Sequence, residues 1–540
     1  MRLVLSAAKP NRVDAPGGSH FPSRARLLLH ISAGVITALM LLPLLYLLMR
    51  AAGVGPAALE LILHPRTGQV IWNSSLLTVG VTALSLLIAL PLAWLTVRTD
   101  LPGRKLWTIL LTLPLVIPSY VGGFALVAMM GPAGILQSWL APLGVERLPS
   151  IYGLPGALWA LTIFTYPYLF LSIRAGLRNQ DPALEEASNS LGHSRWITFW
   201  RVTLPTLRPA ITSGALLVAL YTLSDFGAVS LLRFNSFTRA IYVQYLSSFD
   251  RSLAALLSLI LVLMTVALLY SERAVQGRAR YYRSSAGASR QSREMRLGRW
   301  RIPALLLVMG VVTAALLLPV GVVTYWLIQG IWAGESFAPM WQATLNTVQA
   351  GMLAALVASL LALPVAYLSA RFPSPYAALI SQAAYIGYGL PGIVVALSLV
   401  FFGANYATIF YQTLGMLIFA YVVRYMPEAM GVLRTNLLQT SPRLEEAARG
   451  LGLNRWQVLG RVTLPLLRPG ILAGAALVFL TTIKELPATL LLGPTGFTTL
   501  ATQIWSATDE AFFARAAAPA LLLLIVSATS IVIILGQEQK

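Results

Sequence analysis

The sequence lacks cysteine and has few histidines and few charged residues. Without cysteine, disulfides, thiolate zinc sites, iron–sulfur clusters and cysteine nucleophiles are all excluded. The four histidines show neither HxxxH nor HExxH spacing, so neither a transition-metal site nor a catalytic site built on imidazole is expected. Charged residues make up only 11% of the chain. With no paired nucleophile and base in view, a membrane-embedded enzyme is the least favoured class.

The lysines exclude a nucleotide-binding phosphate loop. Lys9 precedes proline, Lys105 precedes leucine, Lys484 precedes glutamate, and Lys540 is the last residue. None can belong to GxxxxGK[ST], in which the lysine precedes Ser or Thr and reaches the nucleotide phosphates. If ATP drives this protein, a separate subunit must hydrolyse it.

Apolar residues dominate the rest of the sequence. They make up 57% of the 540 residues, and the mean hydropathy is +0.73, which excludes an ordinary soluble protein. A membrane-spanning helix needs about 20 apolar residues. Runs of that length lie near 27–49, 70–97, 106–130, 154–175, 207–232 and 252–272, and again near 302–329, 343–370, 376–402, 408–432, 467–492 and 516–537. The sequence therefore predicts an all-α polytopic membrane protein with about 12 spans, six in each half.

The two halves are repeats of each other. Asn73, Pro91 and Pro118 recur 273 positions later as Asn346, Pro364 and Pro391, whereas Pro167, Arg174 and Pro182 recur 260 positions later as Pro427, Arg434 and Pro442. The offset changes because the segment 131–153 is longer than its counterpart, which indicates an external loop insertion. We expect an N-terminal tail (1–26), a first repeat (27–272), a linker (273–301) and a second repeat (302–540).

The distribution of positive charge predicts the topology. The net charge is +20, and 30 of the 39 basic residues fall in segments on one side if the N-terminus is cytoplasmic. The positive-inside rule therefore favours a cytoplasmic N-terminus. The most basic run is the linker 273–301, whose Tyr281 and Tyr282 could stack on bases. Because this run joins two membrane halves, we expect it to contact anionic membrane lipid and expect no nucleic-acid partner.

One cytoplasmic stretch occurs twice, at 185–211 (EEASNSLGHSRWITFWRVTLPTLRPAI) and at 445–471 (EEAARGLGLNRWQVLGRVTLPLLRPGI). The copies agree at 16 of 27 positions without a gap. Each predicts a short helix with an acidic first turn and a glycine stop, preceded in the first copy by the cap Asp181 and by Pro182. A second helical run follows in each copy, and Pro205 and Pro465 are expected to end these runs.

These stretches resemble the EAA loop of permease subunits of binding-protein-dependent ABC importers. The resemblance covers both halves and implies two tandem six-helix domains of the type I importer fold. It also implies that each loop is a coupling helix docked on an ATPase. The implied docking positions are Glu185, Glu186, Ala187 and Gly192 in the first copy, and Glu445, Glu446, Ala447 and Gly452 in the second. Ser188 departs mildly from the alanine seen at Ala448.

The resemblance also implies partners. They are two copies of an ABC ATPase, which carry ATP and Mg, and a periplasmic substrate-binding protein. This chain would then be a multi-pass protein of the bacterial inner membrane, a transport subunit with no catalytic residue, cofactor or metal of its own. An ion-gradient secondary transporter built from repeats is the competing class.

The cargo is predicted from two longer segments. Residues 224–245 and 484–505 resemble fused permeases of the ferric iron importer group. Fused thiamine permeases have a similar layout, and polyamine, sulfate and phosphonate permeases share the loop, so these cargoes remain alternatives. Asp225 and Glu485 are equivalent and lie near the outer end of a span. They could face a cationic cargo, or they could pair locally, Glu485 with Lys484 or Arg424.

Overall fold

The computed structural model describes residues 23–247 except 54, 56 and 133, and also 252–276 and 295–538. These residues form helices and connecting loops without any β-strand, which confirms the all-α class. Within these described residues, nine helices are long and apolar enough to cross a membrane, or up to 11 if each of two bent helix pairs counts as one span. Much of the linker, 277–294, lies outside the described residues.

Each of the twelve apolar runs corresponds to a helix or to a broken helix. The main helices of the first half are α1 (Ser23–Ala52), α3 (Pro65–Arg98), α4 (Arg104–Thr112), α5 (Ser119–Met130), α7 (Leu154–Asn179), α11 (Arg208–Ser224), α12 (Gly227–Leu231), α13 (Phe237–Ser247) and α14 (Ser252–Gln276). Those of the second half are α15 (Arg301–Val312), α16 (Leu318–Trp332), α17 (Ala338–Arg371), α18 (Pro375–Ala384), α19 (Ile386–Gly389), α20 (Gly392–Tyr406), α21 (Leu414–Gln439), α24 (Leu464–Thr482), α25 (Pro487–Leu492), α26 (Leu500–Asp509) and α27 (Phe513–Glu538).

The third run of each half is broken in front of an equivalent proline. Ile117 and Leu390 are extended, with ψ of 114° and 130°, and Pro118 and Pro391 follow them. Proline disfavours the helical conformation of the residue before it, so the chain turns there before α5 and α20 begin. In the second half the two parts of the broken helix meet at 100°. These breaks place helix N-termini inside the protein.

The expectation that Pro205 and Pro465 end their helices is wrong for Pro465, whereas the helix that contains Pro205 ends one residue later, at Thr206. A π-helical turn precedes each of them, Phe199–Thr203 and Leu459–Thr463, and helical structure continues through both prolines. The wider turn changes the hydrogen-bond register just before a residue that has no N–H to donate. In the first copy the helix bends by 63° at Leu207, whereas α24 continues from Leu464 to Thr482.

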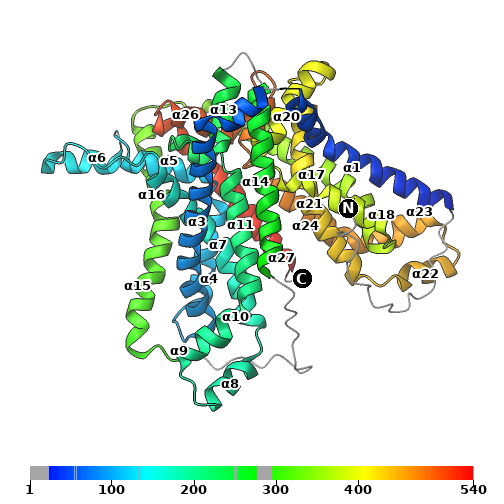
Figure 1. The fold of residues 1–540 in the computed structure, drawn as a ribbon, viewed down its shortest axis with the longest axis horizontal. Helices are drawn as coiled ribbons and strands as arrows, with labels where there is room; N and C mark the ends of the chain where they lie inside the picture. Colours follow the sequence, from blue (N-terminus) through cyan, green and yellow to red (C-terminus); the bar gives the residue numbers. More distant parts are fainter. Residues whose placement is uncertain are drawn as a thin grey trace.

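The two halves are interlocked. The first helix, α1, packs against α17, α18 and α20 of the second half, while α15 and α16 pack against α4 and α5 of the first. The buried side chains form two clusters, and each cluster takes residues from both halves. Figure 1 shows the resulting helical body, from which α6 (Ile135–Leu140), within the predicted insertion, projects beside α5. A movement of one half is therefore transmitted directly to helices of the other.

Candidate coupling helices and central cavity

The duplicated stretch forms two short helices, α8 (Pro182–Ser190) and α22 (Arg443–Gly450), in the lower part of Figure 1. Asp181 caps α8 by accepting a hydrogen bond from the Ala183 N–H at 3.0 Å, as predicted. Gly192 and Gly452 both have φ of +84°, the left-handed conformation that glycine adopts without strain. The cap and the two glycine stops are thus confirmed.

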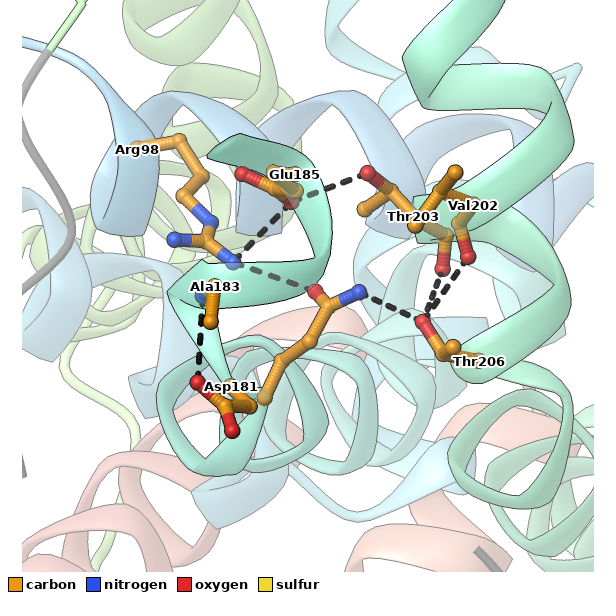
Figure 2. A network of polar contacts seen from close by, with 8 residues as sticks. Arg98, Asp181, Ala183, Glu185, Val202, Thr203 and Thr206 are labelled. Carbon is orange, nitrogen blue, oxygen red and sulfur yellow. Dashed lines mark hydrogen bonds and ion pairs between the residues drawn. The ribbon is translucent and has the colours of Figure 1, made fainter. Parts of the chain in front are cut away.

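The two neighbouring glutamates of α8 point in different directions. Glu185 accepts hydrogen bonds from Arg98 Nη2 at 3.2 Å and from the Thr203 hydroxyl at 2.9 Å. Figure 2 shows Glu185 between these two residues. Arg98 is the last residue of α3, only 5% of its side chain is exposed, and it also donates to Gln180 Oε1 at 3.1 Å. Glu186 is exposed.

The second copy repeats this division. Glu445 is buried, lies 3.7 Å from Arg371 Nη2 and accepts a hydrogen bond from the Tyr367 hydroxyl at 3.0 Å. Arg371, the last residue of α17, donates to the Thr440 carbonyl at 3.0 Å. Glu446 is exposed, like Glu186. The ion pair is longer than in the first copy, so the tyrosine is the closer partner of Glu445.

The arrangement separates the predicted docking residues into two groups. Glu185 and Glu445 face inward and fasten α8 and α22 to the ends of membrane helices. The exposed group consists of Glu186, Ala187, Gly192, Glu446, Ala447 and Gly452. Sequence reasoning missed the two arginines. Their signal was present, because Arg98 and Arg371 end equivalent spans at the offset of 273.

A cavity of about 270 Å³ lies between the two halves. The broken helices line it, together with α7 from the first half and α21 from the second. Five acidic or basic side chains line it: Asp225, Arg424, Glu428, Lys484 and Glu485. The structure therefore brings the two equivalent carboxylates, 260 positions apart in the sequence, into one site.

Both equivalent carboxylates also have local partners. Asp225 accepts a hydrogen bond from the Val229 N–H of α12 at 3.2 Å and lies beside Ser119, the first residue of α5. Glu485 forms an ion pair with Arg424 and accepts a hydrogen bond from the Tyr425 hydroxyl. For Glu485, the predicted alternative of pairing with Arg424 is confirmed. In this state of the protein, each carboxylate holds a broken helix in place.

Comparison with known proteins identifies the repeat. Residues 85–281 and 358–538 each match the family described as binding-protein-dependent transport system inner membrane component. The chain belongs to this family. Membership is consistent with the multi-pass helical body and with a transport subunit that works beside a separate binding protein.

Individual relatives agree with this assignment. The chain is 34% identical over 502 residues to the Fe(3+)-transport system permease protein FbpB 2 of Haemophilus influenzae, an alignment covering 91% of this chain and 95% of the relative. It is 35% identical over 167 residues to the molybdenum permease ModB of Escherichia coli K12, covering 29% of this chain and 69% of ModB. The sulfate permease CysT of the same strain is 29% identical over 250 residues, covering 45% of this chain and 89% of CysT.

Large apolar side chains are exposed beside α8 and α22 in both copies of the repeat. Leu191 and Leu451, which follow α8 and α22, are 78% and 85% exposed, and Trp196 and Trp456 are 69% and 80% exposed. These pairs are equivalent at the offset of 260. Large apolar side chains exposed at equivalent places of both copies are typical of a docking surface. Sequence reasoning missed these side chains, although both copies have identical residues at these positions.

Among the described residues, no group of three or more His, Asp or Glu side chains is placed to hold a metal ion. In the central cavity Asp225 and Glu485 are engaged with their own helices, and Glu428 accepts a hydrogen bond from the Thr481 hydroxyl at 3.0 Å. In this state, both acidic and basic side chains line the cavity.

Proposed function

We propose that the chain is the membrane permease of an ATP-driven importer of ferric iron. The observation that carries the proposal is the relationship to the Fe(3+) permease, which extends over both repeats and over 91% of the chain. The ModB and CysT alignments cover less than half of it. The cavity supports a cationic cargo, since the carboxylates that line it outnumber the basic groups, three to two. Carboxylate and phenol oxygens suit a hard cation such as iron(III).

Coupling to ATP hydrolysis is assigned to α8 and α22. In this proposal each helix docks on one of two ATPase subunits through its exposed glutamate and through the leucine at its C-terminus. The Arg98–Glu185 and Arg371–Glu445 contacts keep each docked helix rigidly attached to a membrane span. Nucleotide-driven closure of the ATPases then moves α3 and α17 and changes access to the central cavity. ATP and Mg stay on the partner, and this side of the membrane is cytoplasmic.

An oxyanion is the second candidate cargo, and one observation favours it. Two broken helices, α5 and α20, begin at the cavity, and helix N-termini attract anions. Lys484 and Arg424 add positive charge. However, Asp225 lies beside Ser119, the first residue of α5, and Glu485 lies against Gly392, the first residue of α20. The chain's own carboxylates thus already occupy the positions that a bound anion would take, so we favour the cation.

Uptake by cells that lack the chain tests the cargo. Import of labelled ferric iron should be lost and should return when the gene is restored, while import of labelled molybdate, sulfate, thiamine and polyamine should not change. Dependence of one of those other imports on the chain, with iron import unaffected, would keep the permease and refute the iron assignment. A variant with Glu186→Arg and Glu446→Arg serves as a matched control, because it should insert normally and transport nothing.

A further inference from the structure

A second cavity, larger than the central one, adjoins it and is lined by residues of the second half. Its volume is about 710 Å³, and α19, α21 and α24 line it. Tyr388 and Glu428 line both cavities, so the two meet at these side chains. From there the second cavity follows α21 as far as Gln439, the last residue before the connection to the coupling helix α22. It therefore runs from the centre of the protein to the ATPase side.

The repeats differ sharply at the junction of the two cavities. Glu428 and Thr481 meet there, and Thr481 donates a hydrogen bond to Glu428 Oε2 at 3.0 Å. At the offset of 260 their equivalents in the first half are Tyr168 and Tyr221, whose ring centroids are 5.9 Å apart. A carboxylate and a small hydroxyl in the second half thus replace two packed aromatic rings in the first. The same position is open and acidic in one repeat and filled in the other.

Polar side chains continue along the same face of α21. Glu428 is followed by Thr435, Asn436 and Gln439, at helical intervals of seven, eight and eleven residues, and all four line the larger cavity. The Asn436 Oδ1 atom is buried and has no hydrogen-bond partner within the described structure. Polar groups inside a membrane are costly when they face lipid, and they usually face water or protein instead. A water-filled passage satisfies both the carboxylate and the amide.

We propose that cargo leaves the central cavity through the larger cavity, along the wall that α21 and α24 form in the second half, and that Glu428 is the residue that selects cations at the junction. The Tyr168–Tyr221 pair closes the equivalent path in the first half. The selection of cations rests on the proposed iron function. The route itself does not, since it follows from the cavities and from the difference between the repeats.

The absence of cysteine permits a direct test of the route. Val432 lines the larger cavity, and its equivalent in the first half is Ser172; both are half-buried. In inverted membrane vesicles, a charged thiol reagent should label Val432→Cys at least about tenfold faster than Ser172→Cys, because hydrocarbon and packed protein exclude ions by more than that factor. Equal rates, or no labelling of Val432→Cys, would overturn the route.

Uptake measurements test the junction. Rebuilding the aromatic pair with Glu428→Tyr and Thr481→Tyr should abolish iron uptake while the ATPase still copurifies. Glu428→Gln should lower the initial uptake rate by at least about tenfold, which corresponds to a transport barrier that is higher by about 1.4 kcal/mol. Glu428→Asp should retain most of the rate, and exposed Glu510→Gln is the matched control.

Wild-type rates in the double-tyrosine variant or in Glu428→Gln would refute the role of the junction. If the wild type itself imports no iron, the proposed cargo fails, yet the labelling of Val432→Cys and Ser172→Cys still decides the route. The two ideas can therefore fail separately.

Discussion

Two adjacent glutamates of the coupling helix should respond differently to the same substitution. In the second copy, Glu445→Gln removes a buried charge that faces Arg371, whereas Glu446→Gln removes an exposed one. The first variant should lose stability and the second should lose affinity for the ATPase. The comparison is well matched, because both changes replace one carboxylate oxygen by an amide nitrogen on the same helix.

The size of the effect follows from the contacts of Glu445. Removing one partner of a buried ion pair typically costs about 3–5 kcal/mol. The side chains of Arg371 and Glu445 are only 9% and 7% exposed, so the pair is buried, but its atoms are 3.7 Å apart. The glutamine can still accept the Tyr367 hydrogen bond. We therefore expect a loss of about 2 kcal/mol, below that range, and a change within about 0.5 kcal/mol for Glu446→Gln.

Thermal unfolding in detergent and binding of the purified ATPase measure these two effects. Glu445→Gln should lower the unfolding midpoint. The number of cargo ions transported per ATP hydrolysed should also fall, because α22 then moves independently of α17. Glu446→Gln should keep the wild-type midpoint and bind the ATPase more weakly. Unchanged stability in Glu445→Gln together with lost stability in Glu446→Gln would refute the division of the two glutamates into an inward and an outward group.

Three further outcomes are expected. Gly192→Ala should destabilise the first coupling helix by about 1 kcal/mol, because a side chain at φ of +84° is strained even where space is open, and thermal unfolding will show whether the midpoint falls. Leu191→Asp with Leu451→Asp should leave insertion normal and abolish ATPase copurification; undiminished copurification would contradict the docking surface. Arg424→Met should cost about 3 kcal/mol by leaving Glu485 without its cation, and adding Glu485→Leu should recover the unfolding midpoint but not transport.

Much of the fold was predictable because long apolar runs mark membrane helices. The internal repeat also shows the pattern of each helix twice. The breaks before Pro118 and Pro391 were not predicted. Proline within an apolar run is compatible with a continuous membrane helix, as Pro91 in α3 shows, and packing decides between the two outcomes. Pro465 gave the opposite error, since α24 continues through it after a π-helical turn, whereas in the first copy the helix extends past Pro205 only to Thr206 and bends at Leu207.

The site was predictable only as a set of positions. Sequence similarity predicted the coupling loops, but a pair of adjacent glutamates does not reveal which one faces inward. That depends on Arg98 and Arg371, which come from distant spans. In the same way, Asp225 and Glu485 were recognised as equivalent, but their common cavity depends on how the two halves interlock. The difference between Glu428 and Tyr168 is visible in the aligned repeats. Only the structure shows that Glu428 lies where the two cavities meet.

Native mass spectrometry of the complex extracted from the membrane tests the central claim most directly. The chain should copurify with two copies of a P-loop ATPase, one for each coupling helix. Glu186→Arg with Glu446→Arg should release both copies while the permease stays folded. Iron uptake that proceeds without any bound ATPase, or ATPase binding that is unaffected by the two charge reversals, would contradict the account of these helices.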